Sequence, residues 1–166
     1  GVVLGETHYI RTLADVPPEF RQHNWPASSD GPGSCVNAST ITILRFMGFE
    51  DHARWWMENF EGGEWDTSHI SHLQASGLLF AFVSDEADGG EQFLEYCSRN
   101  RLPAGIFFGE RHAQNFLGYV DAGKTAVVLD NNDPKVLMFY PRAVFLAEWH
   151  RCGGFAWTFV YKPAQP

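Results

Sequence analysis

Cys35 is the residue of this sequence whose surroundings best suit covalent chemistry. It follows Gly-Pro-Gly-Ser and begins a stretch whose apolar residues recur with helical spacing. At a helix start, unpaired backbone N–H groups and the positive end of the helix dipole favour a thiolate. The same N–H groups can bind the oxyanion that forms when a thiolate attacks a carbonyl. Two interpretations stay open for Cys35 at this point: a nucleophile, or a small buried residue that begins a helix.

His112, Asp130 and Asn131 are the residues that the spacing of the elements brings toward Cys35. His112 begins one apolar stretch, the pair follows the next, and Asp-Ala-Gly-Lys between the stretches predicts a hairpin turn. At their shared end of the hairpin, the imidazole can take a thiol proton and a carboxylate or amide can fix its tautomer. Adjacent strand residues point to opposite faces, so only one of the pair faces His112, and alternation does not choose between them. The alternatives are a surface histidine and an ordinary turn.

The elements expected around these residues predict an α+β fold in one domain. Helical patterns come first and strand-like segments follow, which indicates a helical part packed on an antiparallel β-sheet. We divide the chain into an extended approach segment over 1–34, a helical part over 35–76 and a mainly β part over 77–166. Ser34 is expected to cap the first helix and Gly48 to end it. The expected helices are 35–47, 51–60, 67–76, 91–101 and 142–149, and the expected strands are 78–83, 104–108, 112–120, 125–129, 136–140 and 155–161.

Together these motifs resemble those of the papain-like cysteine peptidases. The nearer likeness is to the small bacterial branch, similar to the double-glycine leader peptidases of bacteriocin exporters. The order of cysteine, histidine and asparagine or aspartate matches, and so does the short gap between the last two. The resemblance covers about residues 20–161 and implies a single papain-like domain. It rests on Gly33-Ser34-Cys35 at a helix start, His112 leading into a strand with Gly118-Tyr119, and an apolar strand ending in Asp130-Asn131-Asn132.

The resemblance implies a role for each member of this set. Cys35 would be the nucleophile and His112 the general base. The family has apolar strand residues before the third member and a polar residue after it, which places Asn131 in the role of orienting the histidine. Asp130 is the alternative, because bacterial members often use aspartate at this point.

The oxyanion donor is where this sequence departs from the family. The family has a glutamine a few residues before the cysteine as oxyanion donor, whereas Ser29 stands at that spacing here. The nearby amides are Asn24 and Gln22, both further upstream. The resemblance therefore implies that the Cys35 backbone N–H binds substrate together with Asn24 or Gln22.

Charge and composition exclude several other classes of function. The 166 residues suit one domain, and 45% hydrophobic with 19% charged residues argues against disorder. The net charge of −8, from 12 Lys and Arg against 20 Asp and Glu, argues against nucleic acid or an anionic membrane as partner. The apolar runs are too short for membrane insertion. Three cysteines make no disulfide framework; Cys97 is expected in the core and Cys152 in a turn, where a bridge stays open.

The remaining histidines do not predict a metal site. His69 and His72 lie three residues apart, with Glu64 and Asp66 nearby, but a zinc site needs further ligands. We favour a solvated histidine pair or one in the first turn of a helix. Neither a metal nor another cofactor is therefore expected.

Three functions fit these residues. The first, which we expect, is a cysteine peptidase or amidase that acts on a peptide or protein through a thioester acyl-enzyme. The second is an acyl-transferring enzyme of the transglutaminase or deamidase kind, with the same residues and another acceptor. The third is a non-catalytic binding module on the same fold, which the missing glutamine favours. Localisation stays open between the cytoplasm and secretion after removal of a signal.

Overall fold

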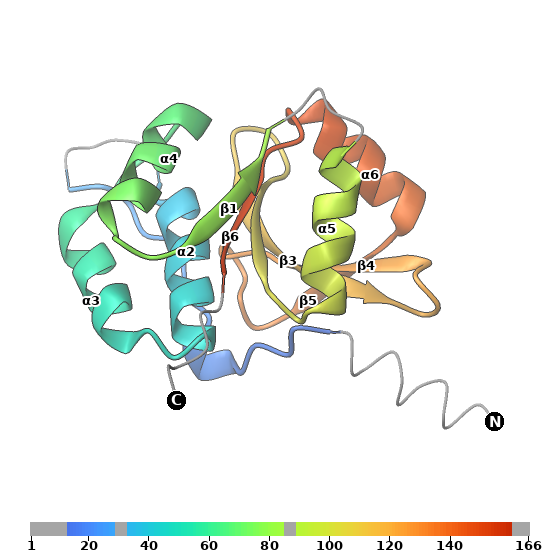
Figure 1. The fold of residues 1–166 in the computed structure, drawn as a ribbon, viewed down its shortest axis with the longest axis horizontal. Helices are drawn as coiled ribbons and strands as arrows, with labels where there is room; N and C mark the ends of the chain where they lie inside the picture. Colours follow the sequence, from blue (N-terminus) through green and yellow to red (C-terminus); the bar gives the residue numbers. More distant parts are fainter. Residues whose placement is uncertain (1–12, 29–32, 85–88, 161–166) are drawn as a thin grey trace.

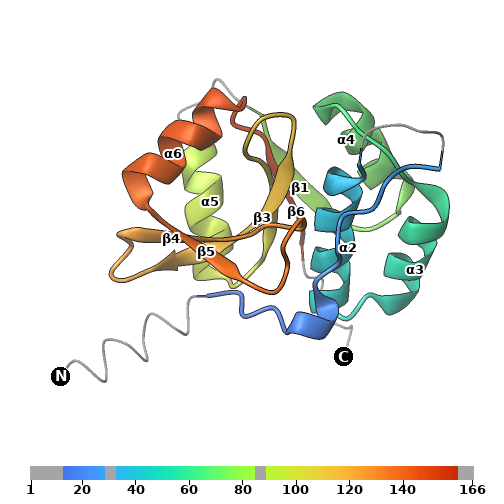
Figure 2. The same ribbon diagram turned by 180° about the vertical axis from the view of Figure 1, so that it is seen from behind.

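A six-stranded antiparallel sheet runs through the middle of the molecule, with helices on both of its faces (Figures 1 and 2). This computed structural model describes residues 13–28, 33–84 and 89–160. The spatial order of the strands is β1-β6-β2-β3-β4-β5, which confirms the predicted α+β class. The strands are β1 (Phe80–Val83), β2 (Ala104–Phe107), β3 (Ala113–Val120), β4 (Thr125–Leu129), β5 (Leu137–Pro141) and β6 (Ala156–Phe159). The helices are the 3-10 helix η1 (Pro18–Phe20), α2 (Cys35–Phe46), α3 (Glu50–Asn59), α4 (Asp66–Ala75), α5 (Gly89–Arg99) and α6 (Arg142–Arg151).

Every predicted helix and strand is present, and the ends differ from the prediction by at most two residues. Of the predicted approach segment, 1–12 and 29–32 lie outside the described residues, as does the predicted end of the last strand at 161. The described part, 13–28, is extended apart from η1 and runs alongside α2 in Figure 2. Among the described residues, no helix combines the length and apolar character needed to cross a bilayer.

The two faces of the sheet bury separate groups of apolar side chains. In Figure 1, α2, α3 and α4 gather on one side of the sheet, and α5 and α6 lie on the other. Trp157 of β6 packs with the first group, whereas the preceding residue, Ala156, packs with the second. This alternation follows from the two-residue period of a strand. The predicted packing of a helical part on the sheet is therefore present, with a second helical layer behind it.

The helix that begins with Cys35 is part of the core. All residues of Cys35–Leu44 are buried, and many are β-branched, so tertiary contacts rather than intrinsic propensity hold the helix. Trp157 Nε1 donates a hydrogen bond to Thr40 Oγ1 at 2.9 Å, and Asn115 Nδ2 donates to the Ser39 carbonyl at 3.1 Å. These bonds fix α2 against β6 and β3, and with it the position of its first turn.

The ends of α2 show one confirmed and one corrected prediction. Gly48 follows the helix with a φ of 82°, a conformation that glycine adopts without strain. Ser34 precedes the helix, but its side chain makes no capping bond to it. The Ser34 hydroxyl instead accepts the backbone N–H of Gly62 at 2.8 Å. The loop between α3 and α4 is therefore tied to the start of α2.

Candidate active site

The side chains of Cys35, His112 and Asp130 meet where the β3–β4 hairpin faces the start of α2. His112 immediately precedes β3 and Asp130 immediately follows β4. The Nε2 atom of His112 lies 2.7 Å from Oδ1 of Asp130, and the ring also forms a hydrogen bond with the Cys35 side chain. Because Nε2 faces Asp130, Nδ1 is the ring nitrogen left for the thiol. The structure thus places His112 and Asp130 at one end of the hairpin, as the sequence spacing predicted, and brings them to Cys35 at the start of α2.

A tight turn positions the His112 ring. The backbone N–H of Phe108 donates to the His112 carbonyl at 3.0 Å and closes the connection between β2 and β3. Within this turn Gly109 has a φ of 89°, in the region that favours glycine. The His112 side chain is 14% exposed, so its orientation is set by protein partners more than by water.

His112 carries a positive charge at neutral pH. Burial alone lowers the pKa of a histidine, but the hydrogen bonds from His112 to Asp130 and Cys35, with the charges of these two groups, raise its pKa from 6.5 to about 9. The site therefore supplies the imidazolium that a thiolate–imidazolium pair requires.

Asp130 remains ionised beside that imidazolium. Burial raises the pKa of the Asp130 carboxyl. The hydrogen bond and charge of His112 and the backbone N–H of Asn132 lower this pKa by more than burial raises it, so the net pKa is below its usual value. The Asn132 N–H donates to Asp130 Oδ1 at 2.9 Å. Asp130 is therefore a fixed acceptor that orients the ring of His112.

Asn131 points away from His112, which corrects the placement implied by the papain-like pattern. Its Nδ2 donates to the carbonyl oxygens of Cys35 and Ala113 at 2.9 and 3.0 Å, and lies 3.0 Å from Ser39 Oγ. Only the NH₂ end of an amide can serve two carbonyl acceptors, so these bonds fix its orientation. Adjacent strand residues point in opposite directions, so only one of the two residues can face His112. Asp130 contacts the His112 ring, and Asn131 binds the Cys35 backbone.

Asn24 lies beside the turn that precedes Cys35. Its N–H donates to the Asn131 carbonyl at 2.8 Å, and its Nδ2 donates to Asn132 Oδ1 at 2.9 Å. A Cβ atom at Gly33 would lie only 2.8 Å from this Nδ2, so the amide packs directly on the backbone of Gly33. Asn24 Oδ1 is buried and has no hydrogen-bond partner among the described residues. Of the two predicted substrate-binding amides, Asn24 therefore borders the site.

Gln22, the other predicted amide, lies near the second half of α2. Its backbone N–H donates to Thr42 Oγ1 at 3.0 Å, and Thr42 is about 10 Å along the helix from Cys35 at 1.5 Å per residue. Its side-chain Nε2 donates to the carbonyl of the adjacent His23 at 2.9 Å. The structure therefore does not bring the Gln22 amide to Cys35.

Asn132 belongs to the site, although the sequence placed it only in the polar run after the strand and gave it no role of its own. Its side chain accepts the hydrogen bond from Asn24, and its Nδ2 lies 3.4 Å from His112 Nε2. It links the segment before α2 to the histidine. The available signal was the run Asp-Asn-Asn directly after a buried strand, which supplies more polar groups than a turn alone requires.

The other two cysteines are not part of the Cys35, His112 and Asp130 set, although Cys152 contacts the turn before His112. Cys97 is in the core as predicted, and burial raises its pKa to about 12. Cys152 lies 3.4 Å from the Gly109 carbonyl and is a free thiol, so the bridge left open for it does not form. Burial also raises the pKa of Cys152.

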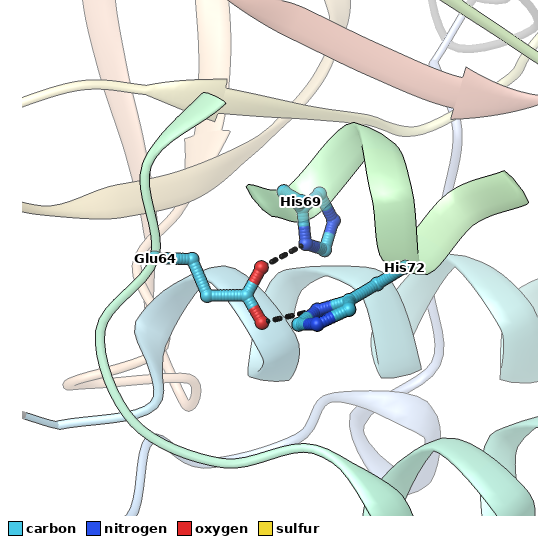
Figure 3. A group of neighbouring side chains, drawn as sticks. All are labelled: Glu64, His69 and His72. Atoms are coloured by element: carbon cyan, nitrogen blue, oxygen red, sulfur yellow. Dashed lines mark hydrogen bonds and ion pairs between the residues drawn. The ribbon is translucent and has the colours of Figure 1, made fainter. Parts of the chain in front are cut away.

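A second polar cluster consists of Glu64, His69 and His72 (Figure 3). The expectation of a solvated histidine pair is wrong, because His69 is completely buried and the Glu64 side chain is only 4% exposed. The alternative, a place in the first turn of the helix, holds for His69 but not for His72. Burial lowers the pKa of His69 despite the neighbouring Glu64 carboxylate. Burial raises the pKa of Glu64, but the hydrogen bond and charge of His69 and the charge of His72 outweigh it, so its pKa is lowered.

A hollow of about 530 Å³ lies at the opposite end of α2 from Cys35. At 1.5 Å per residue, the two ends of this helix are about 16 Å apart, so the hollow is separate from the candidate active site. It is lined by Phe46, Met47, Tyr96, Asn100, Leu102 and Val160.

Searches of protein-family models, curated proteins and solved structures give no match to this chain. The function is therefore argued from the chemistry and geometry of the site.

Proposed function

We propose that the chain is a papain-like cysteine peptidase or amidase that hydrolyses amide bonds of a peptide or protein substrate. The observation that carries the proposal is the position of His112. Its ring forms hydrogen bonds with both Cys35 and Asp130, with Nε2 2.7 Å from Asp130 Oδ1. The proposed nucleophile, acid–base group and orienting group are thus connected by successive side-chain contacts. The nucleophile begins a buried helix.

Acylation uses the thiolate and the imidazolium together. The Cys35 Sγ attacks the amide carbonyl carbon, a C–S bond forms, and the carbonyl oxygen becomes an oxyanion. When the tetrahedral intermediate collapses, the C–N bond breaks and the leaving amine takes the proton of His112. Asp130 holds the ring in place throughout. The products of this half-reaction are a thioester at Cys35 and a free amine.

Deacylation reverses the role of the histidine. His112, now neutral, takes a proton from a water molecule that attacks the thioester carbonyl. The C–S bond then breaks, the carboxylic product leaves, and the thiolate–imidazolium pair is restored. Asp130 again stabilises the imidazolium as it forms, because its carboxylate stays ionised.

The oxyanion is held at the start of α2. The backbone N–H of Cys35 and the positive end of the helix dipole act at this point. Asn24 supplies a second donor: its amide borders the Gly33 backbone and is linked to Asn132. Asn24 takes this role instead of Gln22, because Asn24 packs on Gly33 close to Cys35, whereas Gln22 lies near Thr42 in the second half of α2.

Covalent labelling followed by a cleavage screen tests this function. A thiol-directed acyl-type probe is expected to label the parent chain, and Cys35→Ala and His112→Ala are each expected to abolish that labelling. Cys152→Ala is the control, because Cys152 is a free thiol that is more exposed than the buried Cys35. Labelling of Cys35→Ala at the parent rate would contradict the assignment of the nucleophile.

A non-catalytic binding module is the second candidate, and one observation favours it. Ser29 stands where the family has its oxyanion glutamine, and Gln22 does not replace that residue in space. A module of this kind would bind peptides without releasing an amine. Amine release from a peptide library, absent in Cys35→Ala, would exclude it, and incorporation of an added amine would identify acyl transfer instead of hydrolysis.

A further inference from the structure

The Glu64 carboxylate lies between the imidazole rings of His69 and His72 in Figure 3. Glu64 precedes α4, and the two histidines are three residues apart on α4, so their side chains share one face of the helix. His69 Nδ1 is 2.8 Å from one carboxylate oxygen and His72 Nδ1 is 2.7 Å from the other. Ligand atoms from all three residues lie within 4.8 Å of one another. The three side chains therefore converge on one small volume.

Two buried polar atoms in this cluster contact each other but make no hydrogen bond with each other. Glu64 Oε1 and His72 Nδ1 are buried, and neither has a hydrogen-bond partner among the described residues. They lie close together without the geometry of a hydrogen bond. The Glu64 side chain is only 4% exposed, and a buried carboxylate requires positive charge nearby. A cation bound between these side chains would give each of the two atoms a ligand bond in place of the missing hydrogen bond.

A buried set of outer contacts orients the ligands. His69 Nε2 lies 2.8 Å from Thr40 Oγ1, which also accepts a hydrogen bond from Trp157 Nε1 at 2.9 Å. Asn37 forms a hydrogen bond with the Glu64 side chain. Metal-binding histidines almost always use their second ring nitrogen in this way, to fix the ring and its tautomer.

We propose that Glu64, His69 and His72 bind a divalent transition-metal ion of the zinc class. Two imidazole nitrogens and one carboxylate oxygen are a ligand set that Zn²⁺ accepts, with bonds of roughly 2.0–2.2 Å. Each imidazole binds through a deprotonated Nδ1, so His69 carries its proton on Nε2, where Thr40 Oγ1 accepts it. Any further proton that the metal displaces from an imidazole Nδ1 is released to solvent. The His72 side chain is 30% exposed, so water is the fourth ligand that this cluster leaves to solvent.

The metal would fasten the loop before α4 to α4 itself. This loop reaches the candidate active site, because Gly62 N–H donates to Ser34 Oγ and Asn37 Nδ2 donates to the Gly62 carbonyl at 3.4 Å. Metal binding would thus stabilise the segment that is tied to the start of α2. The proposal concerns stability and metal binding, and it does not depend on whether Cys35 is catalytic.

The test is titration of the full chain, prepared without metal, with Zn²⁺ and with Co²⁺. Cys35→Ser serves as the parent protein, because a thiol beside His112 can itself bind these ions. We expect saturable binding of one ion per chain, the visible absorption of four-coordinate Co²⁺ and a higher melting temperature with Zn²⁺. Bound Co²⁺ should also quench the fluorescence of Trp56, because the centroid of its ring is 5.6 Å from that of His69.

Variants of the ligands decide the outcome. His72→Gln and Glu64→Gln, each in the Cys35→Ser background, are expected to weaken binding by more than the roughly 10–100-fold that loss of an outer contact costs. His150→Gln in the same background is the matched control, because His150 also pairs with a glutamate, Glu91 at 3.2 Å, on a different helix. His72 is changed instead of His69 because the His72 side chain is partly exposed, whereas a substitution at the fully buried His69 would disturb folding. Equal affinity in the parent protein, His72→Gln and Glu64→Gln overturns the proposal, as does a parent protein with no saturable binding.

Discussion

The Nε2 atom of His112 lies 2.7 Å from Oδ1 of Asp130, whereas the adjacent Asn131 points its amide at the Cys35 carbonyl. Two neighbouring residues after one strand therefore serve opposite sides of the same site. One sets the charge and orientation of the histidine, and the other holds the backbone that carries the thiol. This division of roles makes the two residues separable by mutation.

Asp130→Asn is expected to lower the pKa of His112 from about 9 towards the ordinary histidine value of about 6.5. The change keeps the shape of the side chain but removes the negative charge that stabilises the imidazolium. Turnover of a substrate should fall by on the order of 10²-fold or more, because the acid–base group His112 loses the carboxylate that orients its ring and stabilises its charged form. The measurement is an NMR titration of the His112 ring beside a kinetic assay. Asp133→Asn, in the turn that follows, is the control, and an unchanged His112 titration in Asp130→Asn would refute the pairing.

The stability of the fold is expected to fall as pH rises from about 6.5 to about 9, through the titration of His112. The folded-state pKa is raised above the unfolded value, so the contribution of His112 is complete below about 6.5 and is lost as pH passes about 9. The difference in free energy of unfolding between the parent and His112→Gln should therefore shrink across this window. Urea denaturation at several pH values measures it. In a Cys35→Ala background the pH range over which stability falls should narrow, because only Asp130 then raises the pKa of His112. A difference in free energy of unfolding that does not change with pH would contradict the prediction.

The order and type of the elements followed from the sequence because the local signals were consistent. The Asp-Ala-Gly-Lys turn between two apolar strands placed His112 and Asp130 at one end of a hairpin, and strand β4 begins and ends at the predicted residues. Gly48 ended the first helix as its conformational freedom suggests. These features depend on neighbours in the chain, which a sequence shows directly.

The details that the sequence missed depend on contacts between distant segments. Ser34 was predicted to cap the helix, but its hydroxyl accepts a hydrogen bond from the Gly62 backbone N–H instead. The choice between Asp130 and Asn131 required knowing which side of the strand end faces α2. His69 looked like a surface residue, but Thr40 and Glu64 enclose it. No local pattern records such partners, because they come from packing of α2 against α4 and the sheet.

Asn131→Ala is expected to destabilise the chain by about 1–3 kcal/mol, because it leaves the buried carbonyl oxygens of Cys35 and Ala113 without their donor. The free energy of unfolding from urea denaturation measures the loss. Asn132→Ala is the control, because its side-chain bonds are exposed and its loss should cost less. The titration of His112 should change little in Asn131→Ala. A large fall in the pKa of His112, with stability unchanged, would return Asn131 to the orienting role.

Gly105→Ala is expected to destabilise the fold by roughly 1–3 kcal/mol or more, because the added methyl would overlap the Trp157 ring. A Cβ atom at this position would lie 2.1 Å from ring atoms of Trp157, whose Nε1 holds Thr40 of α2. A double-mutant cycle with Trp157→Leu checks the cause. The smaller side chain should relieve most of the cost of Gly105→Ala, and strictly additive effects would show that the tryptophan is not the obstacle.

Asn24→Ala is expected to slow acylation by roughly 10²–10³-fold, the usual cost of losing one oxyanion donor. The physical reason is the position of its amide against Gly33, two residues before Cys35. Gly33→Ala should have a similar effect, because the new methyl would displace the same amide from 2.8 Å away. Gln22→Ala is the matched control and should react at the parent rate, since Gln22 lies near Thr42, about 10 Å along α2 from Cys35. Single-turnover kinetics with an ester and an amide substrate measure the step. A parent-like rate in Asn24→Ala would leave the backbone N–H groups of α2 as the oxyanion donors.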